Sequence, residues 1–353
     1  YRSENFDEMM EKGYLVRTER GVRITMQMFG QEVFFDPTNP EARKFVWNKI
    51  KENYWDKGVK IFWLDEAEPE YTEYDYDNYR YYLGSDLEVG NIYPVKYAKA
   101  FYDGMREEGM ENPLNLLRCA WAGSQRYGAL VWSGDIDSTF NSLQRQLKAG
   151  LSMGISGIPW VTTDIGGFQG GNIHDEDFKK LLIRWFEFGC FSPVFRLHGY
   201  RMPGSDFEND MISGIGQLGS GAENEVWSYG EEYYKIMKKY LFLRERIRPY
   251  ISEQMEAAHQ DGTPVMRPLF YDFPEDKNSW EIDDQYMFGP DLLVAPVIEK
   301  EQYQRSVYLP EGSEWEDAWT GKKYDGGQFI SVEAKLETIP LFLKDGVELP
   351  IRE

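Results

Sequence analysis

Apolar runs, polar loops and amphipathic stretches alternate along most of the chain. Apolar residues recur with the 3.6-residue period of a helix in five stretches, the last long enough for two helices: 41–55, 93–108, 138–152, 175–189 and 225–260. Short apolar runs predict strands at 59–64, 114–119, 129–132, 157–163 and 192–196. Because strands that alternate with helices form βα units, the pattern predicts an α/β fold with a parallel sheet.

The pattern changes after residue 262. Residues 263–353 contain short β-like runs separated by turn sequences such as Asp-Gly-Gly at 325–327. We therefore predict two domains: an α/β domain over residues 1–262 and a small all-β sandwich over residues 263–353.

Charged or titratable residues lie at or just after the end of each predicted strand. They are Asp65, Arg118, Asp135, Asp164 and His198. In a (β/α)₈ barrel this C-terminal rim carries the active site. Polar residues also end strands simply because loops are solvated, which is the better explanation for any one of them. Five in successive units favour an active site.

The number of strands is too small for a closed barrel. Only five βα units precede the β region, whereas a barrel needs eight. An open five-stranded sheet would expose apolar faces and unpaired edges. We therefore expect the chain to be a fragment of a longer catalytic unit, or one half of a split enzyme.

Charge and composition exclude several classes of partner. The chain has 60 acidic and 39 basic residues, a net charge of −21. Nucleic acid is excluded because phosphate binding needs a basic face, and an anionic membrane surface is disfavoured for the same reason. No apolar run reaches the roughly 18 residues of a membrane-spanning helix. Aromatic residues make up 16% of the chain, which suits a core, an interface or a sugar-binding cleft.

Metal and cofactor chemistry find little support in the sequence. Two cysteines, Cys119 and Cys190, and three histidines are too few for a disulfide framework or a His-rich metal site. The glycine-rich stretch 166–171 lacks the Lys-Ser/Thr of a phosphate-binding loop, and no G-x-S-x-G motif of a serine nucleophile is present. We expect neither a metal nor a cofactor.

Two acidic clusters combine a tryptophan with an aspartate. Trp63 precedes Asp65 by two residues, and Trp132 precedes Asp135 by three. A glycosidase uses such pairs, because an aromatic ring packs on the apolar face of a sugar while a carboxylate meets the anomeric carbon or the leaving oxygen. Retention of configuration would require the two carboxyl groups to lie about 5–5.5 Å apart.

At these clusters the chain resembles glycoside hydrolase family 31. Its members are retaining α-glucosidases, α-xylosidases and related α-transglycosylases, with a (β/α)₈ barrel flanked by β-sandwich domains. The resemblance covers nearly the whole chain and rests on motifs in the family's order: Trp-Leu-Asp-Glu-Ala-Glu at 63–68, Leu-Arg at 117–118, Trp-Ser-Gly-Asp at 132–135, Gly-Ile-Pro through Gly-Gly-Phe at 157–168, and Arg-Trp through Arg-Leu-His at 184–198.

The resemblance implies a role for each motif residue. Asp65 would be the nucleophile and Asp135 the acid/base. The sugar would be bound by Trp63, Arg118, Trp132, Asp164, Phe168 and His198. The five predicted strands would be strands four to eight of the barrel, and the first three would lie before Tyr1. One departure is that Glu66-Ala67 stands where the family commonly has Met-Asn.

The resulting hypothesis is a retaining exo-α-glycosidase. It would hydrolyse terminal non-reducing α-glucosides or α-xylosides by double displacement through a covalent glycosyl-enzyme. Its partners would be an oligosaccharide or α-glycoside substrate and the missing N-terminal segment, and a homo-oligomer is compatible. The cytoplasm is the favoured location, and any signal peptide would lie before Tyr1.

Alternatives stay open at the level of the sequence. The chain could be an α-transglycosylase of the same family, or a non-catalytic carbohydrate-binding fragment. Arg118 could be a structural partner of Asp164, and His198 could be a buried histidine that does not contact substrate. The tryptophans and Phe168 could belong to the core.

Overall fold

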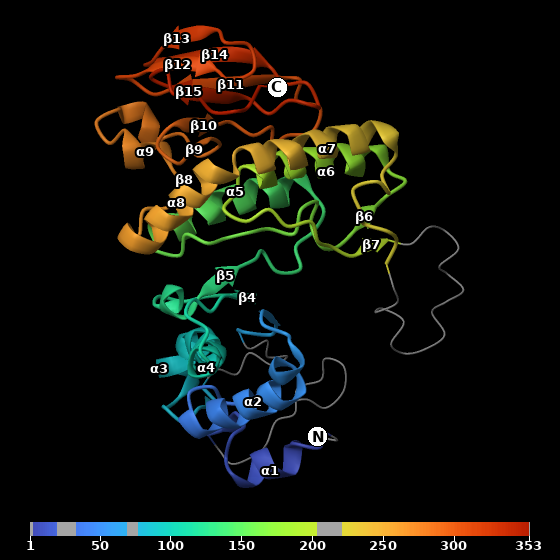
Figure 1. Ribbon diagram of the computed structural model, residues 1–353, viewed down its shortest axis with the longest axis vertical. Coiled ribbons are helices and arrows are strands. Elements are labelled where there is room, and N and C mark those ends of the chain that lie inside the picture. Colours follow the sequence, from blue (N-terminus) through green and yellow to red (C-terminus); the bar gives the residue numbers. More distant parts are fainter. Residues whose placement is uncertain (1–2, 20–32, 69–76, 203–220, 353) are drawn as a thin grey trace. The chain divides into compact units, whose positions relative to one another are not determined.

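The computed structural model describes residues 3–19, 33–68, 77–202 and 221–352 (Figure 1). The chain divides into two compact units, Tyr1–Trp132 and Ser133–Glu353. Within the described ranges, no helix has both the length and the apolar character that crossing a membrane requires.

The first unit is built around a parallel sheet. Its strand order is β2-β4-β5, and the strands are β2 (Phe62–Leu64), β4 (Asn115–Leu117) and β5 (Ala129–Val131). The long helices beside it are α2 (Pro40–Asn53) and α4 (Tyr93–Glu107). These elements confirm the predicted helices at 41–55 and 93–108 and the first three predicted strands.

Close packing of α2 on α4 depends on a glycine. Trp47 of α2 lies against Gly104 of α4, where a Cβ atom would come within 2.0 Å of the indole ring. The same ring makes edge contacts with Trp55, Phe62 and Phe101 at centroid distances of 5.6, 6.4 and 6.2 Å. This aromatic cluster anchors both helices to strand β2 and so supports the strand end that carries Asp65.

Shorter elements surround this sheet. They are α1 (Phe6–Glu11), the antiparallel pair β1 (Arg17–Thr18) and β3 (Tyr79–Arg80), α3 (Asp86–Val89), and the 3₁₀ turns η1 (Trp55–Lys57), η2 (Gly90–Ile92) and η3 (Ser124–Tyr127). Each is too short to show a helical or alternating period, so the hydrophobic pattern did not predict them.

Four long helices open the second unit. They are α5 (Phe140–Ile155), α6 (Glu176–Cys190), α7 (Glu231–Arg246) and α8 (Arg248–Asp261). Thr139 and Asp175 cap α5 and α6 by accepting a backbone N–H within the first turn. Pro249 in the first turn of α8 explains why the predicted stretch 225–260 forms two helices, because proline removes a helical N–H donor.

Two predicted strands of the second unit do not form strands, and residues 192–194 are bent. Residues 157–163 and 192–196 are joined by one backbone bond, from the N–H of Val194 to the carbonyl of Val161 at 3.3 Å. The Thr162 hydroxyl donates to the Val194 carbonyl at 3.0 Å and so occupies an acceptor that a strand pair would use. Beyond them, β6 (Gly171–Asn172) and β7 (Arg201–Met202) form a two-residue parallel pair.

The C-terminal part of the second unit has two antiparallel layers. A six-stranded sheet has the order β13-β12-β15-β10-β9-β8, and β11 pairs with β14. The strands are β8 (Met266–Arg267), β9 (Tyr286–Phe288), β10 (Leu292–Val294), β11 (Gln304–Leu309), β12 (Glu314–Asp317), β13 (Lys323–Asp325), β14 (Gln328–Glu333) and β15 (Leu341–Lys344). Buried Leu293, Val307 and Trp315 from different strands share one core, which confirms the predicted β domain.

One β-like run of this domain, at 264–273, does not form the strand that its apolar residues predict. Residues 264–273 contain only the short strand β8, followed by the helical turn α9 (Leu269–Asp272). Pro268 ends the strand, because a proline has no N–H to donate to a sheet. A further 3₁₀ turn, η6 (Lys277–Trp280), follows.

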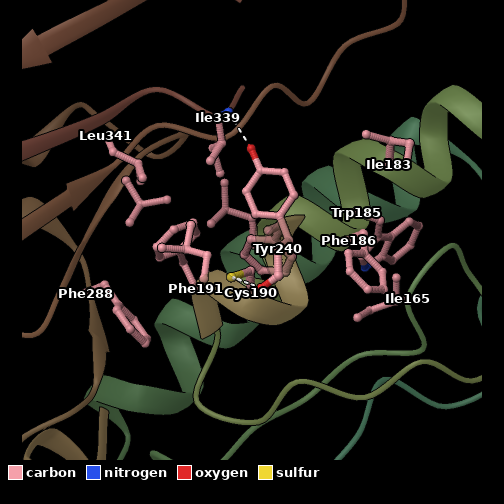
Figure 2. Packing of buried hydrophobic residues seen from close by; sticks show 14 of the residues in the cluster. Ile165, Ile183, Trp185, Phe186, Cys190, Phe191, Tyr240, Phe288, Ile339 and Leu341 are labelled. Atoms are coloured by element: carbon pink, nitrogen blue, oxygen red, sulfur yellow. Dashed lines mark hydrogen bonds between the residues drawn. The ribbon is translucent and has the colours of Figure 1, made fainter. Parts of the chain in front are cut away.

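A buried polar network ties α6 and α7 to the loop between β14 and β15. Glu187 of α6 is fully buried and accepts hydrogen bonds from Arg184 Nη1 at 3.0 Å and from the Tyr240 hydroxyl at 2.9 Å. The Tyr240 oxygen accepts the backbone N–H of Ile339 at 3.1 Å (Figure 2). Arg184 also donates to the carbonyls of Ala334 and Lys335 at 2.6 and 2.8 Å. The β domain is therefore fastened to the helices by a core that is partly polar.

Burial dominates the protonation of Glu187. Desolvation raises its pKa from an ordinary 4.5 to about 7, although Arg184 and Tyr240 act in the opposite direction. The folded protein therefore holds this proton more tightly than the unfolded chain does. The stability that follows is complete below pH 4.5 and is lost as the pH rises through about 7.

The variant Glu187→Gln tests this network. It keeps the size and the acceptor oxygen of the side chain but cannot ionise. As the pH rises from about 5 to 8, we expect the free energy of unfolding of the variant to increase relative to that of the wild type by about 2 kcal/mol. Urea unfolding at each pH measures the difference, and a difference that does not change with pH would contradict the assignment.

Candidate active site

The parallel sheet of the first unit brings predicted site residues to one edge. Phe62, Asn115 and Ala129 are register partners at the start of β2, β4 and β5. The residues that directly follow these three-residue strands are Asp65, Arg118 and Trp132. Because the carboxyl ends of parallel strands meet at the same edge, the fold confirms that these residues share the rim of the sheet.

Arg118 holds the loop that follows β2. Its Nη1 lies 3.5 Å from Asp65 Oδ1 and 3.2 Å from Glu66 Oε1, and its Nε lies 2.8 Å from Glu68 Oε1. The side chain of Arg118 is only 14% exposed, whereas that of Asp65 is 52% exposed. The guanidinium thus anchors the loop chiefly through Glu66 and Glu68, and the Asp65 carboxylate stays accessible to solvent.

The backbone of this loop is bent sharply at the residue after Asp65. Glu66 has a φ of +52°, in the left-handed region that residues other than glycine seldom occupy. Its N–H donates to Asp65 Oδ1 at 2.9 Å. Strained residues are typical of functional loops. Here the conformation of Glu66 aims its N–H at Asp65 and so fixes the direction of the Asp65 carboxylate.

Two tryptophans belong to the same strand ends: Trp63 precedes Asp65 by two residues, and Trp132 directly follows β5. The rings of Trp63 and Trp132 make an edge contact with centroids 5.4 Å apart at an interplanar angle of 88°. Trp132 is 3% exposed and Trp63 is 47% exposed. A buried ring therefore orients an exposed one, which gives Trp63 the fixed apolar face that a sugar requires.

In the second unit, the loop that carries Asp135 is joined to the loop that carries Asp164. The Ile136 carbonyl accepts the N–H groups of Phe168 and Gln169 at 2.7 and 3.0 Å. The N–H of Asp164 donates to Ser133 Oγ at 3.0 Å. These bonds fix the loop on both sides of Asp135, whose side chain remains exposed.

Gly167 allows the two loops to approach this closely. It has a φ of +80°, and a Cβ atom there would lie 2.6 Å from the backbone of Ser138. Any larger residue would separate the loops and displace Asp135.

Asp164 is a buried carboxylate paired with an arginine. It is 0% exposed and accepts a hydrogen bond from Arg196 Nη1. Its pKa is raised to about 6, chiefly by burial and also by the charge of Asp135, although Arg196 and Arg201 act in the opposite direction. Asp164 therefore acts here as the partner of Arg196, a role that the sequence did not identify.

Phe168 and His198 lie together. Their rings stack with centroids 5.8 Å apart and an interplanar angle of 25°, and both residues are half-buried. The histidine is therefore not a fully buried core residue. The stacked pair adds two aromatic rings to the predicted site residues of the second unit, Asp135 and Asp164.

The predicted residues thus form two groups, one in each unit. Asp65, Arg118 and the two tryptophans belong to the first; the second consists of Asp135, Asp164, Phe168 and His198. The separation of about 5–5.5 Å between Asp65 and Asp135 that retention requires stays a prediction.

The sequence did not show which side chains hold these loops in place. They are Glu66, Glu68, Arg196 and Arg201. Arg196 lies two positions before His198 in a motif, but sequence distance gives no sign of its pairing with Asp164. In the ranges that the structure describes, His, Cys, Asp and Glu side chains nowhere gather in threes suited to a metal ion.

Family models match most of the chain. The model described as the glycosyl hydrolases family 31 TIM-barrel domain matches residues 1–254. The model of the glycosyl hydrolase family 31 C-terminal domain matches residues 262–347.

Known proteins and structures agree with these matches. An α-xylosidase of Saccharolobus solfataricus is 36% identical over 90% of this chain and 41% of its own length. A protein of Pseudescherichia vulneris named as an uncharacterized family 31 glucosidase is 60% identical over 57% of this chain and 38% of its own. The crystal structure of a family 31 α-xylosidase from a soil metagenome, complexed with xylose, has a TM-score of 0.92 at 60% identity and covers 98% of this chain and 51% of its own. The chain thus spans at most about half of each.

The pairing of Asp164 with Arg196 is tested by the variant Arg196→Met. Without the cation, the buried carboxylate is left uncompensated at about pH 8, and we expect the free energy of unfolding to fall by about 3 kcal/mol. Near pH 5 the loss should be smaller, because Asp164 takes up a proton below its pKa of about 6. Urea unfolding at both pH values measures the effect.

The double variant Arg196→Met/Asp164→Asn is the matched control. It removes both charges, so it should recover much of the stability lost at high pH. Equal losses at the two pH values, or strict additivity of the two substitutions, would contradict the pairing.

Proposed function

Because this chain belongs to glycoside hydrolase family 31, we propose that it carries the two catalytic carboxylates of a retaining exo-α-glycosidase. The fold is the family's TIM-barrel domain followed by its C-terminal β domain. The observation that carries the proposal is the exposed Asp65 carboxylate at the rim of a parallel sheet, held by Arg118 and two residues after the exposed Trp63.

The first chemical step transfers the sugar to the enzyme. The Asp65 carboxylate attacks the anomeric carbon of an α-glycoside, and the bond from that carbon to the leaving oxygen breaks. Asp135 donates its proton to the leaving oxygen, and the product is a β-linked glycosyl-enzyme.

The second step releases the sugar. Asp135, now ionised, takes a proton from water, and the water oxygen attacks the anomeric carbon from the face that the leaving group has vacated. The ester bond to Asp65 breaks, so that the released sugar has the α configuration and Asp135 is protonated again.

The remaining predicted residues surround the sugar. In this proposal Trp63 and Phe168 supply apolar faces, and Arg118 and His198 supply groups for sugar hydroxyls. Trp132 and Asp164 are buried and act on the sugar site through their contacts with Trp63 and Arg196. The loop bonds that lie on both sides of Asp135 support its role, because a proton donor must be held within hydrogen-bond reach of the leaving oxygen.

We propose that residues 1–262 are barrel and residues 263–353 are the β domain. Five βα units are predicted from this sequence, whereas the barrel of the family has eight. The other strands would come from a preceding segment of the same enzyme, in agreement with the chain's coverage of 41% of the S. solfataricus α-xylosidase.

An α-xyloside is the substrate that the comparisons favour. The soil-metagenome structure at 60% identity is of an α-xylosidase, and so is the S. solfataricus protein. Xylose lacks the hydroxymethyl group that glucose carries at C5, so a pocket for xylose must exclude that group.

The roles of the two aspartates are tested by azide rescue in the intact protein. Asp65→Gly and Asp135→Ala should each fold normally and lose hydrolysis, Asp135→Ala by roughly 10²–10⁴-fold. Azide in place of the Asp65 carboxylate attacks from the face opposite the leaving group and should give a β-glycosyl azide. Azide in place of Asp135 attacks the glycosyl-enzyme from the other face and should give an α-glycosyl azide. NMR of the products distinguishes them, and reversed anomers would refute the assignment.

Substrate preference is tested with 4-nitrophenyl α-xyloside, α-glucoside and α-galactoside. If the pocket excludes a hydroxymethyl group, kcat/KM for the xyloside should exceed that for the glucoside by roughly tenfold or more. Release of nitrophenol measures the rates. A glucoside that reacts as fast as the xyloside would contradict the preference but not the retaining mechanism.

A further inference from the structure

Arg201, a residue outside the predicted site, binds the backbone of the loop that follows Asp164. Its Nη2 donates to the Ile165 carbonyl at 2.9 Å and its Nη1 to the Gly167 carbonyl at 2.8 Å. Its Nε donates to Asn224 Oδ1 at 2.9 Å and to the Tyr229 oxygen at 3.0 Å. The side chain is 0% exposed, so all of these bonds are shielded from water.

Glycines make room for this guanidinium. A Cβ atom at Gly199 would lie 2.6 Å from Arg201 Nη1 and 2.5 Å from the Gly167 carbonyl oxygen. At Gly171 it would lie 2.9 Å from Nη1, and at Gly166 3.0 Å from Nη2. Glycine at these three positions lets β6, β7 (Figure 1) and the loop close around one side chain.

The loop that Arg201 holds is the one that holds Asp135. Gly167 contacts the backbone of Ser138, and the next two residues, Phe168 and Gln169, donate their N–H groups to the Ile136 carbonyl. Ser138 donates its N–H to the Gln169 carbonyl at 2.8 Å. A movement of the Gly167 carbonyl would therefore pass directly to Ile136 and Ser138, which follow Asp135 in the chain.

The acceptors of Arg201 are two backbone carbonyls, an amide oxygen and a phenol oxygen, all uncharged. Its positive charge is therefore not neutralised by these contacts, and it lowers the pKa of Asp164. Arginine suits this position because its planar fork reaches two carbonyls at once, which the single ammonium group of lysine cannot reproduce.

We propose that Arg201 is a positioning residue for acid/base catalysis. By fixing the 165–167 backbone, it sets the position of the Asp135 carboxyl group relative to the leaving oxygen. This inference rests on the proposed function, because it assumes that Asp135 is the proton donor.

The test compares leaving groups in the intact protein. A methyl α-glycoside needs a proton on its leaving oxygen, whereas a 2,4-dinitrophenyl α-glycoside does not. For Arg201→Lys, we expect kcat/KM on the methyl glycoside to fall at least about tenfold more than on the dinitrophenyl glycoside. The burst of dinitrophenol counts active sites, so that a loss of folded enzyme does not enter the comparison.

A second variant and a matched control accompany it. Tyr229→Phe removes one acceptor of Arg201 and should show the same leaving-group pattern to a smaller extent, even if Arg201→Lys fails to fold. Arg305 is also buried. It donates to the carbonyls of Asp284, Pro296 and Ser306 in the β domain, and it pairs with the Asp284 carboxylate at 2.8 Å. Arg305→Lys should lower stability but change both substrates by the same factor.

Asp135→Ala distinguishes a failure of the proposed function from a failure of the inference about Arg201. If the loss of kcat/KM in Asp135→Ala is the same for both leaving groups, the proposed function fails, and the inference fails with it. If Asp135→Ala discriminates between the leaving groups but Arg201→Lys and Tyr229→Phe do not, the proposed function stands and Arg201 is only structural. Discrimination by all three variants, but not by Arg305→Lys, supports the inference.

Discussion

Buried and half-buried guanidinium groups hold the loops on which the candidate site is built. These loops leave strand ends and irregular segments with few backbone bonds of their own, so their polar groups need partners elsewhere. Arg118 gathers the carboxylates after β2, Arg196 pairs with Asp164, and Arg201 binds the carbonyls of the next residues. A guanidinium has five donors in a rigid fork, so one side chain can fix the direction of a loop segment.

Arginines pair with some of the acidic groups, namely Glu66, Glu68 and Asp164. The carboxylates at the strand ends therefore have different environments. Asp65 and Asp135 are exposed, whereas Asp164 is buried and its pKa is raised to about 6. The candidate nucleophile and acid/base are thus the most accessible acids of each cluster, and the less exposed acids serve as anchors. This division of roles is what a site needs if its reacting groups are to meet a substrate while their supports stay fixed.

The same principle extends to the β domain, where Arg184, Glu187 and Tyr240 join α6 and α7 to one connecting loop. The predicted helices and most strands of both parts followed from periodicity, because long amphipathic or apolar stretches bury one face whatever their partners are. Residues 157–163 and 192–196 show the limit of this reasoning. Their apolar pattern fits a strand, but the Thr162 side chain takes the Val194 carbonyl that a ladder would use, and such a local contact leaves no mark in the pattern.

By itself the sequence determined the long helices, three parallel strands with Asp65 at the end of one, and a C-terminal β region, because each follows from local spacing. It also carried the family resemblance, since that rests on short motifs in a fixed order. The tertiary structure alone decided which side chains meet: Arg118 with Glu66 and Glu68, Asp164 with Arg196, and Arg201 with the Gly167 loop. These partners stand between 32 positions apart in the sequence, for Arg196 and Asp164, and 52 positions apart, for Arg118 and Glu66. Their pairing depends on how strands and loops are brought together, and neither hydrophobic period nor charge pattern encodes that.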